Sequence, residues 1–156
     1  MTTESEDLAY DLHVLVARLD ASADRILQAT HAVTYRRFLT VLALRDLGAT
    51  TQRALAERLG VSEPSVSRMT AVLASDGLVL VESDPAGGNR RRLTLTRRGL
   101  SLTSACVKTL EGRLVALVEG SGVPYASYAR HTRQLLQALA TDGAVQPTDD
   151  VEGGAA

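Results

Sequence analysis

The chain has 156 residues, of which 45% are hydrophobic and only 3% aromatic, and its formal net charge is −1. This length predicts one domain whose core must come from Leu, Val and Ala, as in helix-rich proteins, and the single Cys106 excludes an internal disulfide and fits a reducing cytoplasm. No segment is apolar enough over sufficient length to span a membrane, and the acidic N-terminus lacks the basic region of a signal peptide.

Apolar residues recur at three-, four- or seven-residue steps over 8–28, which predicts a first amphipathic helix. A second helix is predicted over 34–47 and ends before Gly48, a residue type common just after helix C-termini. The apolar stripes are formed by Leu8, Leu12, Leu15, Val16, Leu19, Ile26 and Leu27 in the first helix and by Phe38, Val41, Leu42 and Leu44 in the second.

The segment 51–69 predicts two short helices joined by a tight turn. Gly60 supplies the left-handed residue that ends the first helix, and Ser62 is a favourable N-cap for the second. This is the anatomy of a DNA-reading helix-turn-helix, and the alternative is an ordinary helical hairpin. We expect Leu55, Ala56, Leu59, Val66, Met69, Val72 and Leu73 to be buried and Ser65, Ser67, Arg68 and Thr70 to face outward.

A β-hairpin is predicted to follow the two helices. A strand-like run over 78–81 and an alternating run over 90–96 flank the turn-forming segment 84–89. Three consecutive arginines, residues 90–92, stand beside this turn, where guanidinium groups can follow a phosphate backbone or enter a narrow minor groove. An arginine run alone is usually a solvated face. Its place directly after a helix-turn-helix favours a DNA-binding wing.

The near-zero net charge is an average over unlike parts of the chain. Residues 1–11 and 141–156 together carry eight acidic residues and no Lys or Arg. Ten of the 18 acidic residues therefore remain in 12–140 against all 17 basic ones, which gives this body a formal charge of about +7. All of these bases except Lys108 are arginine, the better residue for two-point contacts with phosphate and guanine.

Two further helices are predicted over 97–118 and 124–140, separated by a segment rich in Gly and Pro. Together with the first helix they are more apolar than a small DNA-binding head needs for its own packing. This favours a homodimer interface that presents two recognition helices to successive major grooves, and the alternative is a monomeric helical core. Their apolar residues are Leu102, Cys106, Leu110, Leu114 and Leu117, then Tyr128, Leu135, Leu136 and Leu139.

The order of these elements resembles the MarR (multiple antibiotic resistance regulator) family of dimeric winged-helix transcription factors. The resemblance spans roughly residues 8–140, and its specific motifs lie within 51–99. The residues that carry it are Thr51-Gln52, Leu55-Ala56, Leu59-Gly60-Val61-Ser62, Ser65-Val66-Ser67-Arg68, Leu73, Asp76-Gly77-Leu78-Val79, Asp84-Pro85 and Leu95-Thr96-Arg97-Arg98-Gly99.

The resemblance implies an α+β, mostly helical fold with a winged helix-turn-helix domain over 34–99 and dimerisation helices over 8–33 and 100–140. Residues 1–7 are then an acidic flexible N-terminus, and the composition of 141–156 predicts a disordered acidic tail. The resemblance also implies a homodimer on a pseudo-palindromic double-stranded DNA operator, and repression relieved by a small-molecule effector. The alternative is an architectural or protein-docking winged helix that binds DNA without sequence preference.

Eight residues are expected to bind DNA. Arg68 is the candidate for a base contact, because a guanidinium can pair with guanine O6 and N7 together. Asn89 stands where family wings usually carry an Asp that fixes the position of the wing arginine. Because this Asp is replaced, the sequence leaves open whether Arg90 or Arg91 enters the minor groove. The serines are expected to face the major groove, where contacts with bases and contacts with phosphates are alternatives, and for Ser62 a further alternative is that it only caps the helix. The full set is Thr51, Ser62, Ser65, Ser67, Arg68, Asn89, Arg90 and Arg91.

In this family the effector pocket lies between the dimerisation helices and the DNA-binding head. By position, the residues near it are His13, His31, Tyr35, Arg36 and Arg37, and for each the alternative is a solvated or satisfied core side chain. Cys106 lies on an apolar stripe and is expected to be a core residue with little thiolate character. The sequence has no Gly-rich phosphate loop, nucleophile elbow or metal-ligand cluster, so we predict no enzyme, no cofactor and no metal site.

Overall fold

The computed structural model describes residues 7–84, 87 and 90–142. Two compact units make up the chain, Met1–Glu111 and Gly112–Ala156. Most of the two segments predicted to be flexible, and the candidate wing residue Asn89, lie outside the described residues.

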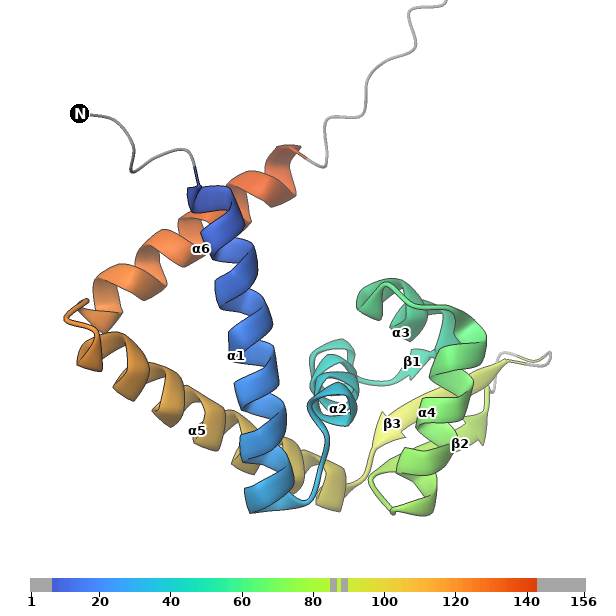
Figure 1. Ribbon diagram of the computed structural model, residues 1–156. Coiled ribbons are helices and arrows are strands. Elements are labelled where there is room, and N and C mark those ends of the chain that lie inside the picture. Colours follow the sequence, from blue (N-terminus) through green and yellow to red (C-terminus); the bar gives the residue numbers. More distant parts are fainter. Residues whose placement is uncertain (1–6, 85–86, 88–89, 143–156) are drawn as a thin grey trace, which may run out of the picture. The chain divides into compact units, whose positions relative to one another are not determined.

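Six helices and three strands are described, in the order shown in Figure 1. The predicted α+β, mostly helical class is confirmed, and each predicted helix and hairpin strand is present within a few residues of its expected position. The elements are α1 (Leu8–His31), α2 (Tyr35–Leu47), β1 (Thr50–Thr51), α3 (Gln52–Leu59), α4 (Glu63–Ser75), β2 (Val79–Ser83), β3 (Arg91–Leu95), α5 (Arg97–Gly120) and α6 (Tyr125–Asp142).

The sheet has a third strand that the sequence did not reveal. Its order is β1-β3-β2, with both pairs antiparallel. In β1, Thr50 pairs with Leu93 and Thr51 with Arg92. Two residues are too few to show the alternation that identifies a strand in a sequence. The pairing matters because it ties the start of α3 to the base of the wing.

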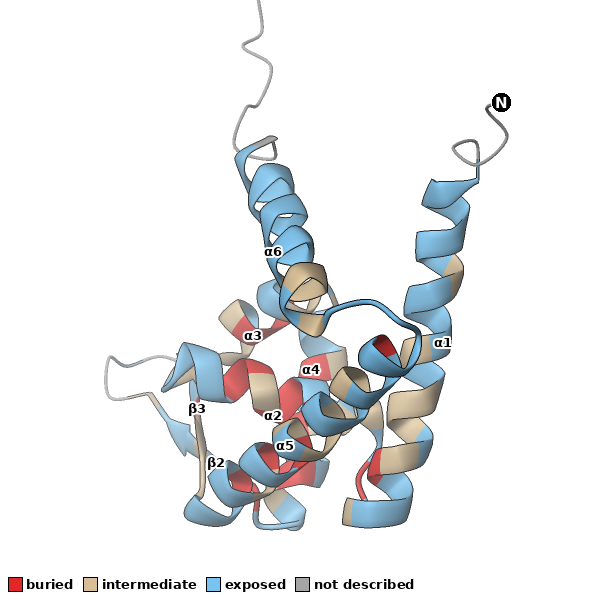
Figure 2. Ribbon diagram, turned by 90° about the vertical axis from the view of Figure 1, so that its left-hand side faces the viewer, coloured by how far each residue is buried: buried red, intermediate tan, exposed pale blue. Residues whose placement is uncertain are grey.

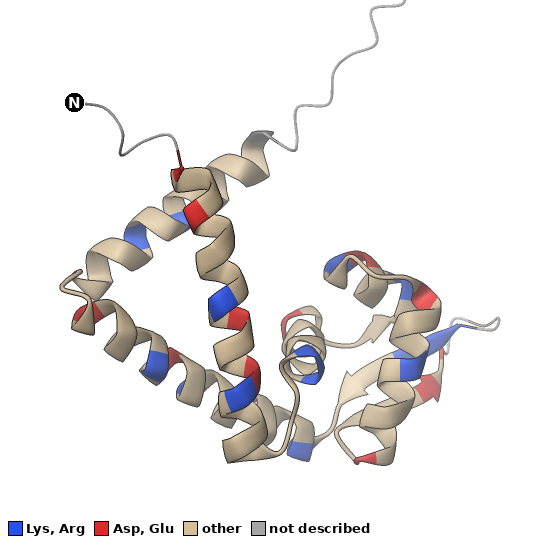
Figure 3. Ribbon diagram, in the orientation of Figure 1, with Lys and Arg blue, Asp and Glu red and all other residues tan. Residues whose placement is uncertain are grey.

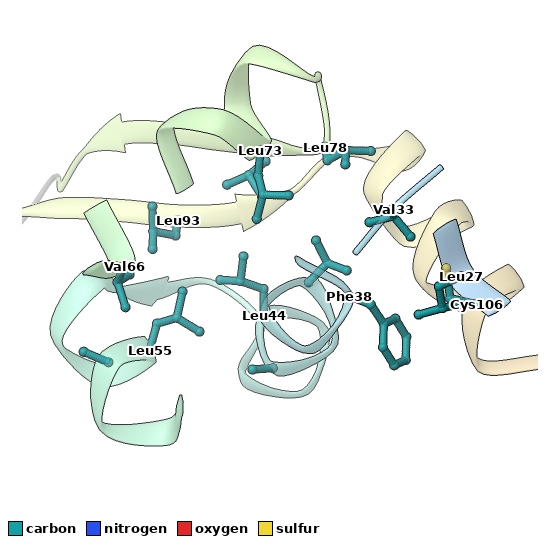
Figure 4. Packing of buried hydrophobic residues seen from close by; sticks show 14 residues of the cluster. Leu27, Val33, Phe38, Leu44, Leu55, Val66, Leu73, Leu78, Leu93 and Cys106 are labelled. Atoms are coloured by element: carbon teal, nitrogen blue, oxygen red, sulfur yellow. The ribbon is translucent and has the colours of Figure 1, made fainter. Parts of the chain in front are cut away.

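The core of the first unit draws on every helix of the head and on the wing (Figure 4). Leu27 of α1, Leu44 of α2, Leu55 of α3, Leu73 of α4 and Leu93 of β3 are all inaccessible to solvent or nearly so. Aliphatic side chains supply nearly all of this buried surface, as the composition predicted. The residues of the cluster hold the helix-turn-helix and the wing in one packed body.

The start of α5 passes unusually close to the turn after α4. A Cβ atom built on Gly99 would lie 2.1 Å from the backbone oxygen of Leu78. The Thr96 hydroxyl donates to the Gly77 oxygen at 2.7 Å and accepts from the Gly99 amide at 3.0 Å. The absence of a side chain at Gly99 therefore lets α5 leave the wing directly across the end of α4.

The buried face of α4 differs from the predicted one at two positions. Thr70, expected to face outward, is buried with 1% of its surface exposed, whereas Val72 is 39% exposed. Val66, Thr70 and Leu73 repeat at steps of four and three and so define the buried stripe. The Thr70 hydroxyl donates to the backbone oxygen of Val66 at 2.9 Å, which satisfies it inside the core. The prediction failed because it treated threonine as a polar surface residue. A threonine hydroxyl can instead be buried when it donates a hydrogen bond to a backbone oxygen of its own helix.

Long apolar side chains remain exposed on α1 and α6. Figure 2 shows the N-terminal part of α1 and most of α6 in the colour of exposed residues. These side chains include Leu8, Leu12, Leu15 and Val16 on α1, and Leu135, Leu136 and Leu139 on α6. In the part of the chain that the structure describes, no helix is long and apolar enough to cross a membrane.

Candidate nucleic-acid interface

Local hydrogen bonds and backbone conformation define the ends of the two helices of the helix-turn-helix. The Thr51 hydroxyl caps α3 by accepting from the Ala54 amide at 3.2 Å, and Gly60 ends this helix in the left-handed conformation with φ of 65°. The Ser62 hydroxyl caps α4 by accepting from the Ser65 amide at 3.4 Å. Each cap satisfies an amide that the helix itself leaves unpaired. The predicted N-cap role of Ser62 is thus confirmed, and the structure adds an N-cap role for Thr51.

A row of hydrogen-bonded polar groups runs along α4. The Ser62 and Ser65 hydroxyls lie 2.9 Å apart, and Nη2 of Arg68 donates to the Ser65 hydroxyl at 3.4 Å. Residues three apart are neighbours on a helix surface, so these contacts hold the Arg68 side chain along the helix. Arg68 and Ser67 are exposed, whereas Ser65 is half-buried. The row leaves further guanidinium N–H groups of Arg68 free to face a ligand.

The base of the wing and the start of α3 form a second polar surface. Thr51, Arg90 and Arg91 line a common hollow of about 410 Å³. Antiparallel pairing of β1 with β3 produces this arrangement, since it places Thr51 opposite Arg92. Figure 3 shows basic residues on α4 and at this end of β3. The hollow is also lined by Gln52, Arg53 and Glu63, which are not among the residues predicted to bind DNA.

Arg53 is the most informative of these added residues. It occupies the first turn of α3, and its Nε donates to Glu57 Oε1 at 3.1 Å. The signal that could have identified it is its place two residues after the Thr51 cap, at the helix end that faces the wing. Periodicity alone could not identify it, because an exposed arginine with an acidic residue four positions later is an ordinary feature of helix surfaces.

Two of the five candidate effector residues line one cavity. His31 and Arg37 border a cavity of about 550 Å³ together with Asp76 and Arg98. Nε2 of His31 lies 2.8 Å from the Thr109 hydroxyl, and Nη1 of Arg37 lies 3.5 Å from Asp76 Oδ2. The apolar part of the lining comes from Val33, Leu78 and Leu102. The volume of this cavity is within the range of small-molecule sites.

The other three candidates lie elsewhere. His13 is exposed on α1, and Arg36 borders two hollows beside α4 instead of the cavity. Tyr35 packs in the head, with its ring stacked on Phe38 at a centroid distance of 6.1 Å. Burial raises the pKa of the Tyr35 phenol, and the charge of Asp20 and a hydrogen bond to it raise this pKa further. Tyr35 is therefore a neutral structural hydroxyl at physiological pH.

Cys106 is fully buried on α5. Burial raises the pKa of its thiol, because the thiolate is poorly solvated there. The prediction of a core cysteine with little thiolate character is confirmed. No group of three or more His, Cys, Asp or Glu side chains capable of holding a metal ion occurs among the residues described.

Comparisons with known proteins agree with this geometry. Residues 33–92 match the model of the MarR family. A MarR-family transcriptional regulator from Rhodococcus sp. RHA1 superposes with a TM-score of 0.75 at 18% identity, covering 90% of this chain and 96% of that one. A cysteine-to-serine mutant of MarR from E. coli gives 0.73 at 20% identity, covering 85% and 96%.

The same E. coli mutant has also been solved in complex with operator DNA, and that structure gives a TM-score of 0.70 at 19% identity, covering 89% of this chain and 98% of that one. No curated protein sequence gives a significant match. Residues 33–92 thus match the MarR family model, and the chain has the winged helix-turn-helix fold of the MarR-family structures.

Proposed function

We propose that the chain is a sequence-specific, dimeric DNA-binding transcriptional regulator that acts as a repressor. The observation that carries this proposal is the Ser62–Ser65–Arg68 row on α4, with the exposed guanidinium of Arg68 at its end. A recognition helix reads base edges in the major groove through such outward side chains. A similar fold in the E. coli protein solved with operator DNA supports the same use of α4 here.

The wing and the start of α3 supply the contacts that position α4. In our proposal Arg90 or Arg91 follows the backbone or enters the minor groove, and Thr51 and Arg53 lie near an adjacent phosphate. These backbone contacts do not distinguish one base sequence from another, but they set the register of the protein on DNA. Their arrangement around one hollow at the wing supports this division of roles.

Dimerisation is proposed through the helices outside the head, over 8–33 and 100–140. The support is the apolar surface left exposed on α1 and α6, where Leu8, Leu135 and Leu139 are each more than half exposed. Large apolar patches on a single chain mark interaction surfaces. A twofold dimer would pair two copies of α4 with a pseudo-palindromic operator. A repressor then acts by occupying DNA that the transcription machinery needs.

Fluorescence anisotropy tests the proposal. The full chain is titrated on the DNA upstream of its own gene and on shuffled DNA of equal length, at two salt concentrations. We expect tight, salt-sensitive binding, a large preference for the upstream DNA and two chains per site. Equal affinity for all sequences in a subsequent random-sequence selection would instead identify an architectural DNA-binding protein. Absence of binding at low salt would refute the DNA-binding function.

The cavity lined by His31, Arg37 and Arg98 is the proposed effector site. Two guanidinium groups and an imidazole beside the apolar Leu102 suit a small molecule with a carboxylate and an apolar body. Such a carboxylate would compete with Asp76 for Arg37, whose present contact of 3.5 Å ties α2 to the end of α4. By breaking the Arg37–Asp76 ion pair, a ligand would alter the position of the recognition helix.

The effector site is tested with benzoate, phenylacetate and hexanoate as probes. We expect at least one of them to raise the melting temperature of the wild-type protein and to release it from DNA, because a ligand that binds only the folded state stabilises it. Arg98→Gln should abolish the shift, whereas Arg45→Gln, which lies outside the cavity, should retain it. An equal shift in both variants, or none in the wild type with any probe, would argue against this site.

A further inference from the structure

Arg36 lies beside the recognition helix, away from the proposed effector cavity. It borders a hollow of about 370 Å³ that Arg37 also lines, together with Ser65 and Arg68 from the polar row on α4. Met69 and Val72 form the apolar part of the same hollow. Figure 3 shows basic residues on both α2 and α4. Arg36 thus brings a side chain of α2 to the surface around α4, which also includes the wing and the start of α3.

The charge of Arg36 is unbalanced in the described part of the chain, in contrast to that of its neighbour. Arg37 faces Asp76 at 3.5 Å, whereas no ion pair between described residues involves Arg36, which is exposed. Both arginines stand in the first turn of α2, which contains no acidic residue. A cation near a helix N-terminus is electrostatically unfavourable. The charge of Arg36 is therefore unfavourable for its own helix.

The position of this hollow on α4 fits one strand of a DNA backbone. With about 100° between successive residues of an α-helix, Ser65, Met69 and Val72 lie on one flank of α4, and Glu63 lies on the opposite flank. Glu63 belongs to the hollow that contains the wing arginines. A helix in the major groove has one phosphate backbone along each flank. The wing side meets one of them, and the α2 side meets the other.

We propose that Arg36 binds a backbone phosphate on the α2 flank of the recognition helix, with the adjoining deoxyribose against Met69 and Val72. This inference rests on the proposed DNA-binding function. The guanidinium of Arg36 supplies charge and two-point hydrogen bonding to the phosphate, and the apolar floor suits the carbon face of the sugar. The contact increases affinity for every DNA sequence and does not discriminate between bases.

Arg36→Ala tests the inference in the full chain. The affinities for the upstream DNA and for shuffled DNA should fall by the same factor, about three- to tenfold, and the slope of log K against log salt should decrease by about one. The melting temperature should stay equal or rise, because a cation leaves the positive end of α2. Arg36→Lys should keep the salt slope. Arg45→Ala removes a charge from the last turn of the same helix, where it is paired with Asp46, and is the matched control.

The outcomes separate the two proposals. If the wild type binds neither DNA, the proposed function fails before Arg36 is considered. If the wild type binds but Arg36→Ala behaves like Arg45→Ala in affinity and salt slope, only the role of Arg36 is overturned. A loss confined to the upstream DNA would also overturn it, because it would show that Arg36 reads bases instead of phosphate.

Discussion

Arg68→Ala is expected to lower the affinity for the upstream DNA by about 1–3 kcal/mol while changing the affinity for shuffled DNA much less. The guanidinium of Arg68 is exposed on α4 and held toward Ser65 by a hydrogen bond of 3.4 Å. This contact restricts its side chain before DNA arrives, so less conformational entropy is lost on binding. Anisotropy titrations on both sequences measure the effect.

Two companion variants make this result specific. Arg68→Lys retains the charge but loses the planar fork that pairs with guanine, so it should resemble Arg68→Ala in sequence preference. Arg90→Ala should instead weaken both DNAs equally and flatten the salt dependence, because a wing arginine contacts the backbone. Equal losses on both DNAs for Arg68→Ala would show that Arg68 holds a phosphate, and base reading would then have to come from elsewhere on α4.

Gly99→Ala is expected to destabilise the folded chain by about 1–3 kcal/mol or more, as for overpacked cores. The added Cβ would lie 2.1 Å from the Leu78 oxygen and 3.1 Å from its carbonyl carbon. This oxygen also accepts a hydrogen bond from the Thr96 amide at 3.1 Å, so it cannot move aside without breaking that bond. Urea unfolding followed by circular dichroism gives the change in free energy.

The matched control is Gly112→Ala on the same helix. A Cβ at Gly112 meets nothing within 4 Å, and an alanine within a helix is more favourable than glycine by about 1 kcal/mol. Gly112→Ala should therefore keep or raise the unfolding midpoint. A wild-type midpoint for Gly99→Ala would mean that α5 can shift away from Leu78 at little cost, contrary to the packing described here.

Most of the head was predictable because its elements carry local signals. Gly60 and Ser62 mark the turn between α3 and α4 through their own conformational preferences, and both behave as predicted. The hairpin strands follow from a strand-like run over 78–81 and an alternating run over 90–96, which flank a turn-forming segment. By contrast, Thr70 was misplaced because its burial depends on the residues of other elements that cover it, and its own polarity gave the opposite signal.

The candidate site was only partly predictable for the same reason. Thr51 and Arg90 were each selected by motif, but only the pairing of β1 with β3 brings them to one hollow and adds Arg53. Arg36 and Arg37 are adjacent in sequence and were assigned together to an effector pocket. Arg36 borders the hollow at α4 and not the cavity, whereas Arg37 borders both and faces Asp76.

The sequence by itself determined the helices, the turn of the helix-turn-helix, the hairpin and the identity of the outward arginines, because caps, glycines and periodicity act over a few neighbouring residues. Only the tertiary structure decided which of these groups share a surface. The third strand, the crossing of Gly99 over Leu78 and the contact of Arg37 with Asp76 all depend on residues distant in sequence. Such contacts depend on the packing of whole elements, and no short stretch of sequence encodes them.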